Sequence, residues 1–321
     1  MLKRTKVVII CSLSVLCLSW GANAQKLDYS VFGNVHVSLD KKKSAGNADL
    51  NSNTSTFGIK GGQKLNDNIK AIFKLEWQLD VTNRKKTDAV VDRDQWIGFK
   101  GSFGKLLIGT STSNYKQTSS KIDPLWRTQL EGRSVLMATS SRRLSAGAGN
   151  DRGRLTDSIN YTTPSFNNFS VVVNTTFSGD DSETSGIGIR HATKQSLIFI
   201  DYFSDGDVGG VGDVSADRES AIKIGGYYVV GSWKVSGQIE SSKDIDGSDY
   251  MMLGASYKID DTGTVKFTLG EADGKKKSSS FALLYDYKLG DKSNVYVGYG
   301  SRKDDINADD DIVTIGARYI Y

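Results

Sequence analysis

The chain has 321 residues, a formal net charge of +4 and a mean hydropathy of −0.35. This charge is too small for the basic excess of a typical nucleic-acid-binding protein, and two cysteines and two histidines are too few for a thiolate-rich or imidazole-rich metal site. We therefore expect no nucleic-acid partner, no metal and no cofactor, and the abundant Gly, Tyr and Phe with only two prolines indicate an all-β protein.

The first residues predict the cellular compartment. Lys3, Arg4 and Lys6 precede an apolar run over 7–18, and a small-residue motif over 22–24 follows it. This pattern is typical of a signal peptide, and the run is too short for a membrane-spanning helix. We expect residues 1–24 to be cleaved, leaving residues 25–321 as one domain; an uncleaved anchor and a lipoprotein linked through Cys17 are the alternatives.

The segment 69–80 shows a period of two. Ile69, Phe73 and Leu75 lie on one predicted face, and Lys74 and Glu76 lie on the other. Charges on the second face would be costly in a dry core, so this face should meet water. The same alternation recurs through the chain and predicts a β-barrel whose apolar face contacts lipid.

Turn signals divide the chain into an even number of strands, and short turns alternate with longer polar links, as in outer-membrane barrels. A soluble β-sandwich is the alternative, but aromatic residues recur near strand ends, as expected for membrane-interface girdles: Trp77, Trp96, Trp233, Tyr285, Tyr287 and Tyr299. Sixteen antiparallel strands are predicted near 27–40, 52–64, 68–80, 92–102, 104–111, 154–163, 169–178, 185–194, 196–205, 217–229, 232–241, 249–259, 263–272, 279–289, 293–302 and 311–321.

No set of residues predicts an enzyme. Catalysis in a barrel would need a nucleophile and a base held together, and His191 stands alone within a predicted strand. A lone histidine there is more often a residue of the lumen or of the lipid interface. We expect no catalytic residues.

Four segments carry a resemblance to the Gram-negative general porins of the trimeric proteobacterial type. They are 55–61, 92–104, 154–164 and the terminal aromatic strand that ends at Tyr321, and the resemblance covers residues 25–321. It implies a homotrimer of 16-stranded transmembrane barrels in the outer membrane, inserted by the barrel-assembly machinery through the C-terminal strand. Each barrel would form a water-filled channel for passive diffusion of small hydrophilic solutes and ions.

The resemblance also implies that the third external loop folds inward and narrows the pore. The link over 112–153 fits this role because loops of that length usually have a function. Arg93 should face the lumen if Trp96 faces lipid, since an odd offset changes the face. Thr56 and Thr110 stand where such porins often carry Arg, which weakens the expected basic ladder.

The charges of the loop and its flanking strands predict a weak preference for anions, because charged side chains at a constriction filter ions by sign. Some of the arginines could instead lie at the rim and bind lipopolysaccharide, and the acids could pair within the loop. A structural or adhesive barrel that acts through its external loops is the alternative function. The predicted constriction comprises Arg93, Arg127, Arg133, Arg152 and Arg154 on the basic side, with Asp123 and Glu131 opposite.

Overall fold

The structure, a computed structural model, describes residues 27–83, 89–132, 153–177, 184–205, 219–242, 248–274, 277–304 and 309–321. The predicted signal peptide over 1–24 lies outside these residues. In the part that the structure describes, no helix has the length and apolar character needed to cross a membrane.

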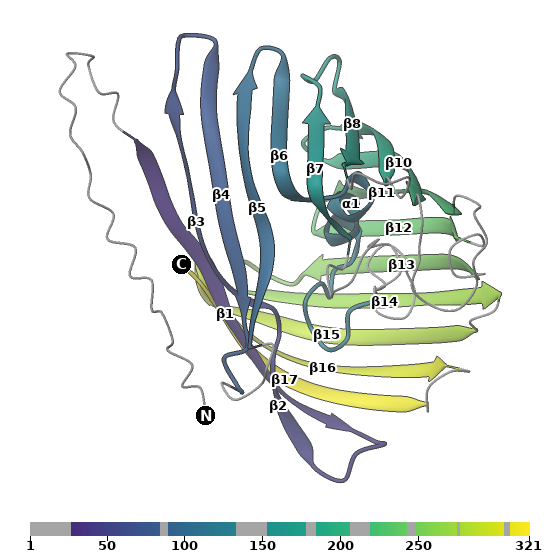
Figure 1. The fold of residues 1–321 in the computed structure, drawn as a ribbon. Coiled ribbons are helices and arrows are strands. Elements are labelled where there is room, and N and C mark those ends of the chain that lie inside the picture. Colours follow the sequence, from purple (N-terminus) through teal and green to yellow (C-terminus); the bar gives the residue numbers. More distant parts are fainter. Residues whose placement is uncertain are drawn as a thin grey trace, which may run out of the picture.

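The described residues form 17 strand segments in one antiparallel sheet that closes on itself (Figure 1). The segments are β1 (Asp28–Lys42), β2 (Ala48–Ser52), β3 (Ser55–Lys64), β4 (Ile69–Leu79), β5 (Val90–Gly101), β6 (Gly104–Thr112), β7 (Arg154–Thr162), β8 (Phe169–Thr176), β9 (Ser185–Ala192), β10 (Ser196–Asp205), β11 (Glu219–Val230), β12 (Trp233–Ser242), β13 (Ser248–Lys258), β14 (Gly263–Gly274), β15 (Ser278–Gly290), β16 (Ser293–Asp304) and β17 (Asp310–Ile320).

The predicted count of sixteen barrel strands is confirmed, because β2 and β3 share one position in the wall. Both segments pair with the same edge of β1, β2 near one end and β3 near the other. The chain is interrupted between them at Asn53 and Thr54, and Thr54 has a φ of 59°. The predicted strand over 52–64 therefore corresponds to β3, which begins at Ser55, whereas β2 precedes it and forms with β1 a hairpin that extends the wall on the loop side.

The first and last strands close the barrel. Asn34 of β1 pairs with Ile320 of β17, and this register continues to Lys42 and Ile312. Beyond β17, the backbone amide of Tyr321 donates to the Gly33 carbonyl at 3.1 Å. The aromatic end of the chain is thus part of the seam, which is the junction between β1 and β17.

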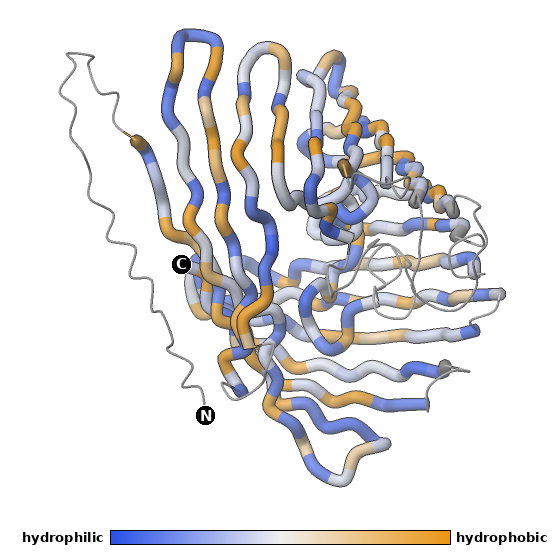
Figure 2. Tube along the Cα trace, viewed as in Figure 1, coloured by the Kyte–Doolittle hydropathy of each residue, from blue (hydrophilic) through white to orange (hydrophobic). Residues whose placement is uncertain are grey.

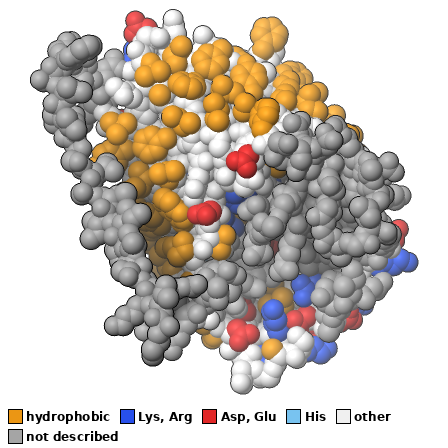
Figure 3. All heavy atoms as spheres, viewed as in Figure 1, with side chains coloured by type: hydrophobic (Ala, Val, Ile, Leu, Met, Phe, Trp, Pro, Cys, Tyr) orange, Lys and Arg blue, Asp and Glu red, His pale blue; other side chains and the backbone are white. Residues whose placement is uncertain are grey.

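The two-residue alternation of the sequence separates the two faces of the wall. Along β4, Leu75 is exposed on the outer face, whereas the adjacent Glu76 is buried inside the barrel. Apolar and polar colours alternate along many strands (Figure 2), and hydrophobic side chains cover the upper part of the outer surface (Figure 3). Outward-facing Trp233, Tyr285 and Tyr287 agree with the predicted aromatic girdle.

A β-bulge changes this alternation between β4 and β5. The pairing shifts by one residue between Leu75 and Trp77, so Glu76 faces both Arg93 and Asp94. A bulge bends the strand and redirects its side chains. Two consecutive charged residues can consequently both face the interior.

One helix, α1 (Asn114–Ile122), follows β6 and contacts β8–β12 on the inner side of the wall (Figure 1). The side chain of Ser113 accepts a hydrogen bond from the Lys116 amide and caps the first turn. The helix ends before Pro124, since proline disfavours helical geometry in the residue that precedes it.

Candidate functional site

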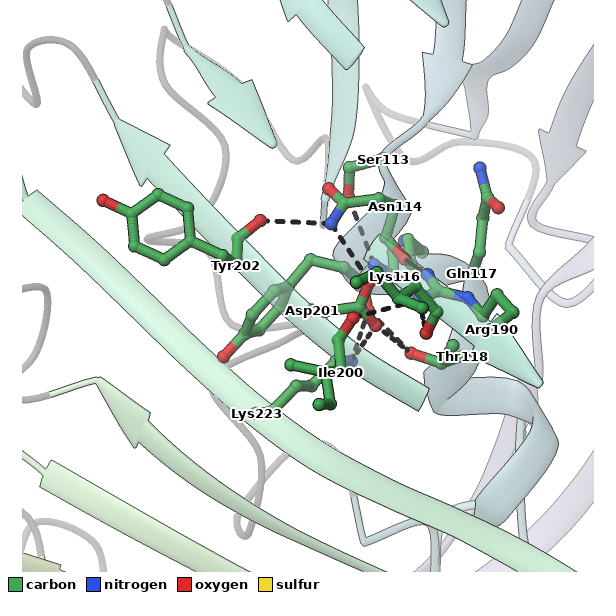
Figure 4. A network of polar contacts seen from close by, with 12 residues as sticks. Ser113, Asn114, Lys116, Gln117, Thr118, Arg190, Ile200, Asp201, Tyr202 and Lys223 are labelled. Atoms are coloured by element: carbon green, nitrogen blue, oxygen red, sulfur yellow. Dashed lines mark hydrogen bonds and ion pairs between the residues drawn. The ribbon is translucent and has the colours of Figure 1, made fainter. Parts of the chain in front are cut away.

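Helix α1 is bound to the wall through the buried carboxylate of Asp201 on β10. This carboxylate accepts hydrogen bonds from Asn114 at 3.0 Å and from Thr118 at 2.9 Å, and it pairs with Arg190 of β9 at 2.5 Å (Figure 4). Lys223 of β11 lies 3.9 Å from the same carboxylate and donates to the Tyr115 carbonyl. The helix is therefore held by charges that are themselves buried in the wall.

The C-terminal end of α1 is held as well. Lys234 donates to the Lys121 carbonyl at 2.8 Å, and Ser236 donates to the Ile122 carbonyl at 2.5 Å. The last carbonyls of a helix have no partner within it, so these wall residues satisfy them. A lysine at this end also complements the helix dipole.

The segment after α1 reaches a different part of the wall. Leu125 and Leu130 pack in one apolar cluster with Tyr296 and other residues of β15–β17. The Gln129 side chain donates to the Asn53 side chain at 2.9 Å. Residues 113–132 thus contact β8–β12 at one end and β15–β17 at the other.

A cavity of about 500 Å³ remains between this segment and the wall formed by β1, β3–β7 and β17. Its lining is strongly basic, with two carboxylates, Glu76 and Asp94, against seven cationic side chains. The cationic residues are Lys74, Arg93, Lys116, Lys121, Arg127, Arg154 and Arg318.

The two carboxylates are each shared by two cations. Glu76 pairs with Lys74 at 2.6 Å and with Arg93 at 2.8 Å. Asp94 pairs with the same Lys74 at 2.9 Å and with Arg154 at 2.9 Å. This chain of pairs neutralises only part of the positive charge of the cavity.

Arg127 adds to the excess of positive charge in the cavity. Its backbone amide donates to Glu131, and among the described residues no ion pair joins its guanidinium to a carboxylate. Burial and the positive charge of Arg93 lower the pKa of Arg127, although arginine remains charged at neutral pH. The charged form is therefore poorly stabilised here, and an anion entering the cavity would stabilise it.

The structure brings Arg93, Arg127 and Arg154 together around this cavity. Asp123 and Glu131 lie in the loop but not in the cavity lining: Asp123 accepts hydrogen bonds from the amides of Leu125 and Gly132, and Glu131 accepts one from the Arg127 amide. Arg133 and Arg152 lie outside the described residues.

One interpretation of the sequence was wrong. Trp96 pairs directly with Lys74, and paired residues point to the same side of a sheet, so Trp96 faces the interior rather than lipid. Arg93 also faces the interior, because the bulge intervenes between the two residues. Thr56 lines the cavity as expected, whereas Thr110 is not part of its lining.

Sequence reasoning missed four of the basic lining residues and both carboxylates. Glu76 and Lys74 were assigned to the water-facing side of their strand, and Arg318 lies on the inward side of β17. The two-residue alternation therefore indicated that Glu76, Lys74 and Arg318 face the interior. Lys116 and Lys121 belong to the basic loop that the sequence predicted, but whether they reach the cavity depends on how α1 docks.

Comparisons with known proteins agree with this architecture. The Gram-negative porin family model matches residues 12–319. Outer membrane porin protein 32 of Delftia acidovorans is 25% identical over 313 residues, covering 89% of this chain and 87% of the relative.

Two solved structures have the same fold. The anion-selective porin from Comamonas acidovorans superposes with a TM-score of 0.78 at 21% identity, covering 92% of this chain and 100% of that one. The trimer form of OmpT from Vibrio cholerae superposes with a TM-score of 0.69 at 15% identity, covering 92% and 99%. The chain belongs to the Gram-negative porin family of outer-membrane channel proteins.

Proposed function

We propose that this protein is a general diffusion channel with a modest preference for small hydrophilic anions. The observation that carries the proposal is the basic cavity, in which seven cationic side chains stand against two carboxylates. Charged side chains that line a constriction select ions by sign. The Comamonas acidovorans neighbour is described as anion-selective, which supports the same sign. The protein acts as a passive pore and not as an enzyme.

In this proposal, the long loop after β6 narrows the pore. Its described part crosses from β8–β12 to β15–β17, which leaves the cavity along β1, β3–β7 and β17 for solutes. Arg93, Arg127 and Arg154 act on passing anions, and Arg133 and Arg152 remain predicted members of the basic side. Asp123 and Glu131 remain predicted opposite them, although their contacts favour a role in shaping the loop.

The preference of the pore for anions over cations should be modest. Charges that face an aqueous lumen are screened within about 8–10 Å at ordinary salt. Glu76 and Asp94 also offset part of the positive field. Selectivity should consequently increase as the salt concentration falls.

We further propose that residues 1–24 are cleaved on export, that the mature chain forms a homotrimer in the outer membrane, and that its rim contacts lipopolysaccharide. The barrel-assembly machinery would insert it through β17 and Tyr321. The trimer form of the Vibrio cholerae neighbour supports the oligomeric state.

Planar-bilayer measurements test the function. The purified protein should conduct in KCl, and the zero-current potential in a salt gradient should show that chloride is preferred, more strongly at low salt. A preference for potassium would overturn the proposed selectivity. Absence of conductance from folded protein would favour a structural or adhesive barrel instead.

A further inference from the structure

Four lysines lie side by side on adjacent strands at the end of the barrel that carries the short turns. Lys64 of β3 pairs with Lys70 of β4, Lys70 with Lys100 of β5, and Lys100 with Lys105 of β6. Directly paired residues point to the same face, and neighbouring strands are about 4.8 Å apart. These four residues, the lysine row, thus place four ammonium groups on one narrow strip of wall.

The lysine row faces the interior. Lys70 lies four residues from Lys74 on β4, and an even offset keeps both side chains on one face. Lys74 lines the cavity at the constriction and pairs directly with Lys60 of β3. Lys60 and Lys74 therefore connect the lysine row to the constriction along the same wall, whose turns lie at the top of Figure 1.

The charge of the lysine row is incompletely neutralised within the chain. Like charges that face each other across strands destabilise a sheet. Lys64 pairs with Asp67 at 2.9 Å, but both side chains are exposed. In the described part of the chain, no ion pair joins Lys70, Lys100 or Lys105 to a carboxylate.

A hollow of about 680 Å³ lies at the lysine row. Lys64, Lys70 and Lys100 line it, and Asp28 and Asp67 are its carboxylates. The polar turn between β3 and β4, which includes Asn66 and Asn68, forms part of the same lining. The hollow therefore offers ammonium and amide donors in a space that is large enough for an anion with several charged oxygens.

We propose that the lysine row is a docking site for soluble oligovalent oxyanions, such as oligophosphates and small polycarboxylates, at the short-turn mouth of the pore. Chloride carries one charge and engages one ammonium group at a time. An anion with several charged oxygens engages adjacent lysines together, which gives it a higher affinity for the row. This inference rests on the proposed function, because the docked anion acts on the ions that pass through an open pore.

The test uses the full mature protein in bilayers of neutral phosphatidylcholine, so that no anionic lipid headgroup can occupy the row. Tripolyphosphate is added to each side in turn while the chloride current is recorded. Addition on the side of the short turns should block the current at lower concentration than addition on the opposite side. The double variant K70Q/K100Q should weaken this block by at least about tenfold.

The matched control is K258Q/K288Q, which removes the same charge at the same end of the barrel. Lys258 pairs with Thr264 and Lys288 with Asn294, so neither belongs to a row of lysines. This control should keep the block of the wild type. Heat-dependent gel migration checks that each variant is folded, and the single variant K100Q replaces the double variant if the latter does not fold.

Equal block in the two double variants, or no block from either side, would overturn the inference. Replacing part of the phosphatidylcholine by anionic lipid should leave the block unchanged, and loss of the block in those bilayers would also overturn the inference, since the row would then bind headgroups. The zero-current potential of the wild type without tripolyphosphate reports separately on the proposed function. A chloride preference without a row-dependent block would leave the channel function in place and remove only the docking site.

Discussion

The carboxylate of Glu76 determines what each nearby cation contributes to the pore. It is shared by Lys74 and Arg93, and Asp94 is likewise shared by Lys74 and Arg154. Removing an arginine from such a pair subtracts a positive charge, and it also leaves the partner carboxylate less neutralised. Arg127 belongs to no such pair among the described residues, so its removal subtracts positive charge alone.

Arg127→Gln should lower the permeability ratio of chloride to potassium by about threefold at low salt, which corresponds to the loss of one unit charge about 12 Å from the ion path in water, because the charge acts on the two ions with opposite sign. Conductance should persist, because among the described residues no hydrogen bond or ion pair joins this guanidinium to the wall. Zero-current potentials in a KCl gradient measure the ratio. An unchanged ratio would mean that the ion path does not pass this guanidinium.

Arg93→Gln should reduce the chloride preference, because Glu76 is then shared only with Lys74. The double variant R93Q/E76Q removes the pair as a neutral unit and should return the preference close to that of the wild type. The same zero-current measurement compares the two variants. If the double variant is as impaired as the single one, the pairing between these residues does not control selectivity.

At the scale of elements, the period of two in the sequence predicted the strands and their inward faces, because it follows directly from strand geometry. It could not predict the bulge opposite Glu76, since Arg93 and Asp94 are adjacent and strict alternation places them on opposite faces. The sequence also could not predict where α1 docks on the wall. Its anchor, Asp201, lies far away in the sequence and shows no local signal.

Asp201→Asn should loosen α1 and destabilise the barrel. The substitution removes the carboxylate that pairs with the buried Arg190 and lies near the buried Lys223, and breaking a buried ion pair on one side typically costs about 3–5 kcal/mol. Urea unfolding followed by heat-dependent gel migration should show the loss, and single-channel traces should become noisier. Asp249→Asn is the control, since Asp249 lies outside this network and accepts a hydrogen bond from Ser241 near the rim.

At the scale of the whole molecule, the sequence predicted a closed barrel of sixteen strands and its membrane, and the fold and family confirm both. The site was predicted only in part. Arg93, Arg127 and Arg154 meet at one cavity, but the carboxylates that face them come from β4 and β5 rather than from the loop. Contacts between side chains of distant segments form only once the barrel wall has closed. The alternation of residues along the sequence does not show which distant side chains will then meet.

The mature protein should migrate as a trimer on unheated gels in mild detergent, with a subunit mass that corresponds to cleavage after Ala24. Apolar side chains on the outer wall can be buried either by lipid or by a neighbouring barrel. Cross-linking and light scattering check the oligomeric state, and mass spectrometry checks the cleavage. Monomeric behaviour in both solution measurements would count against the trimer.

The seam between β1 and β17 has a consequence for the order of events in assembly. Asn34 pairs with Ile320, so closing the barrel joins segments that are separated by almost the whole sequence. Bringing such distant segments together is entropically slow, and until then both strands expose edges that could pair with another chain. Closure therefore requires that β1 and β17 are both present at the same time, and the open sheet exposes two unpaired strand edges until they meet.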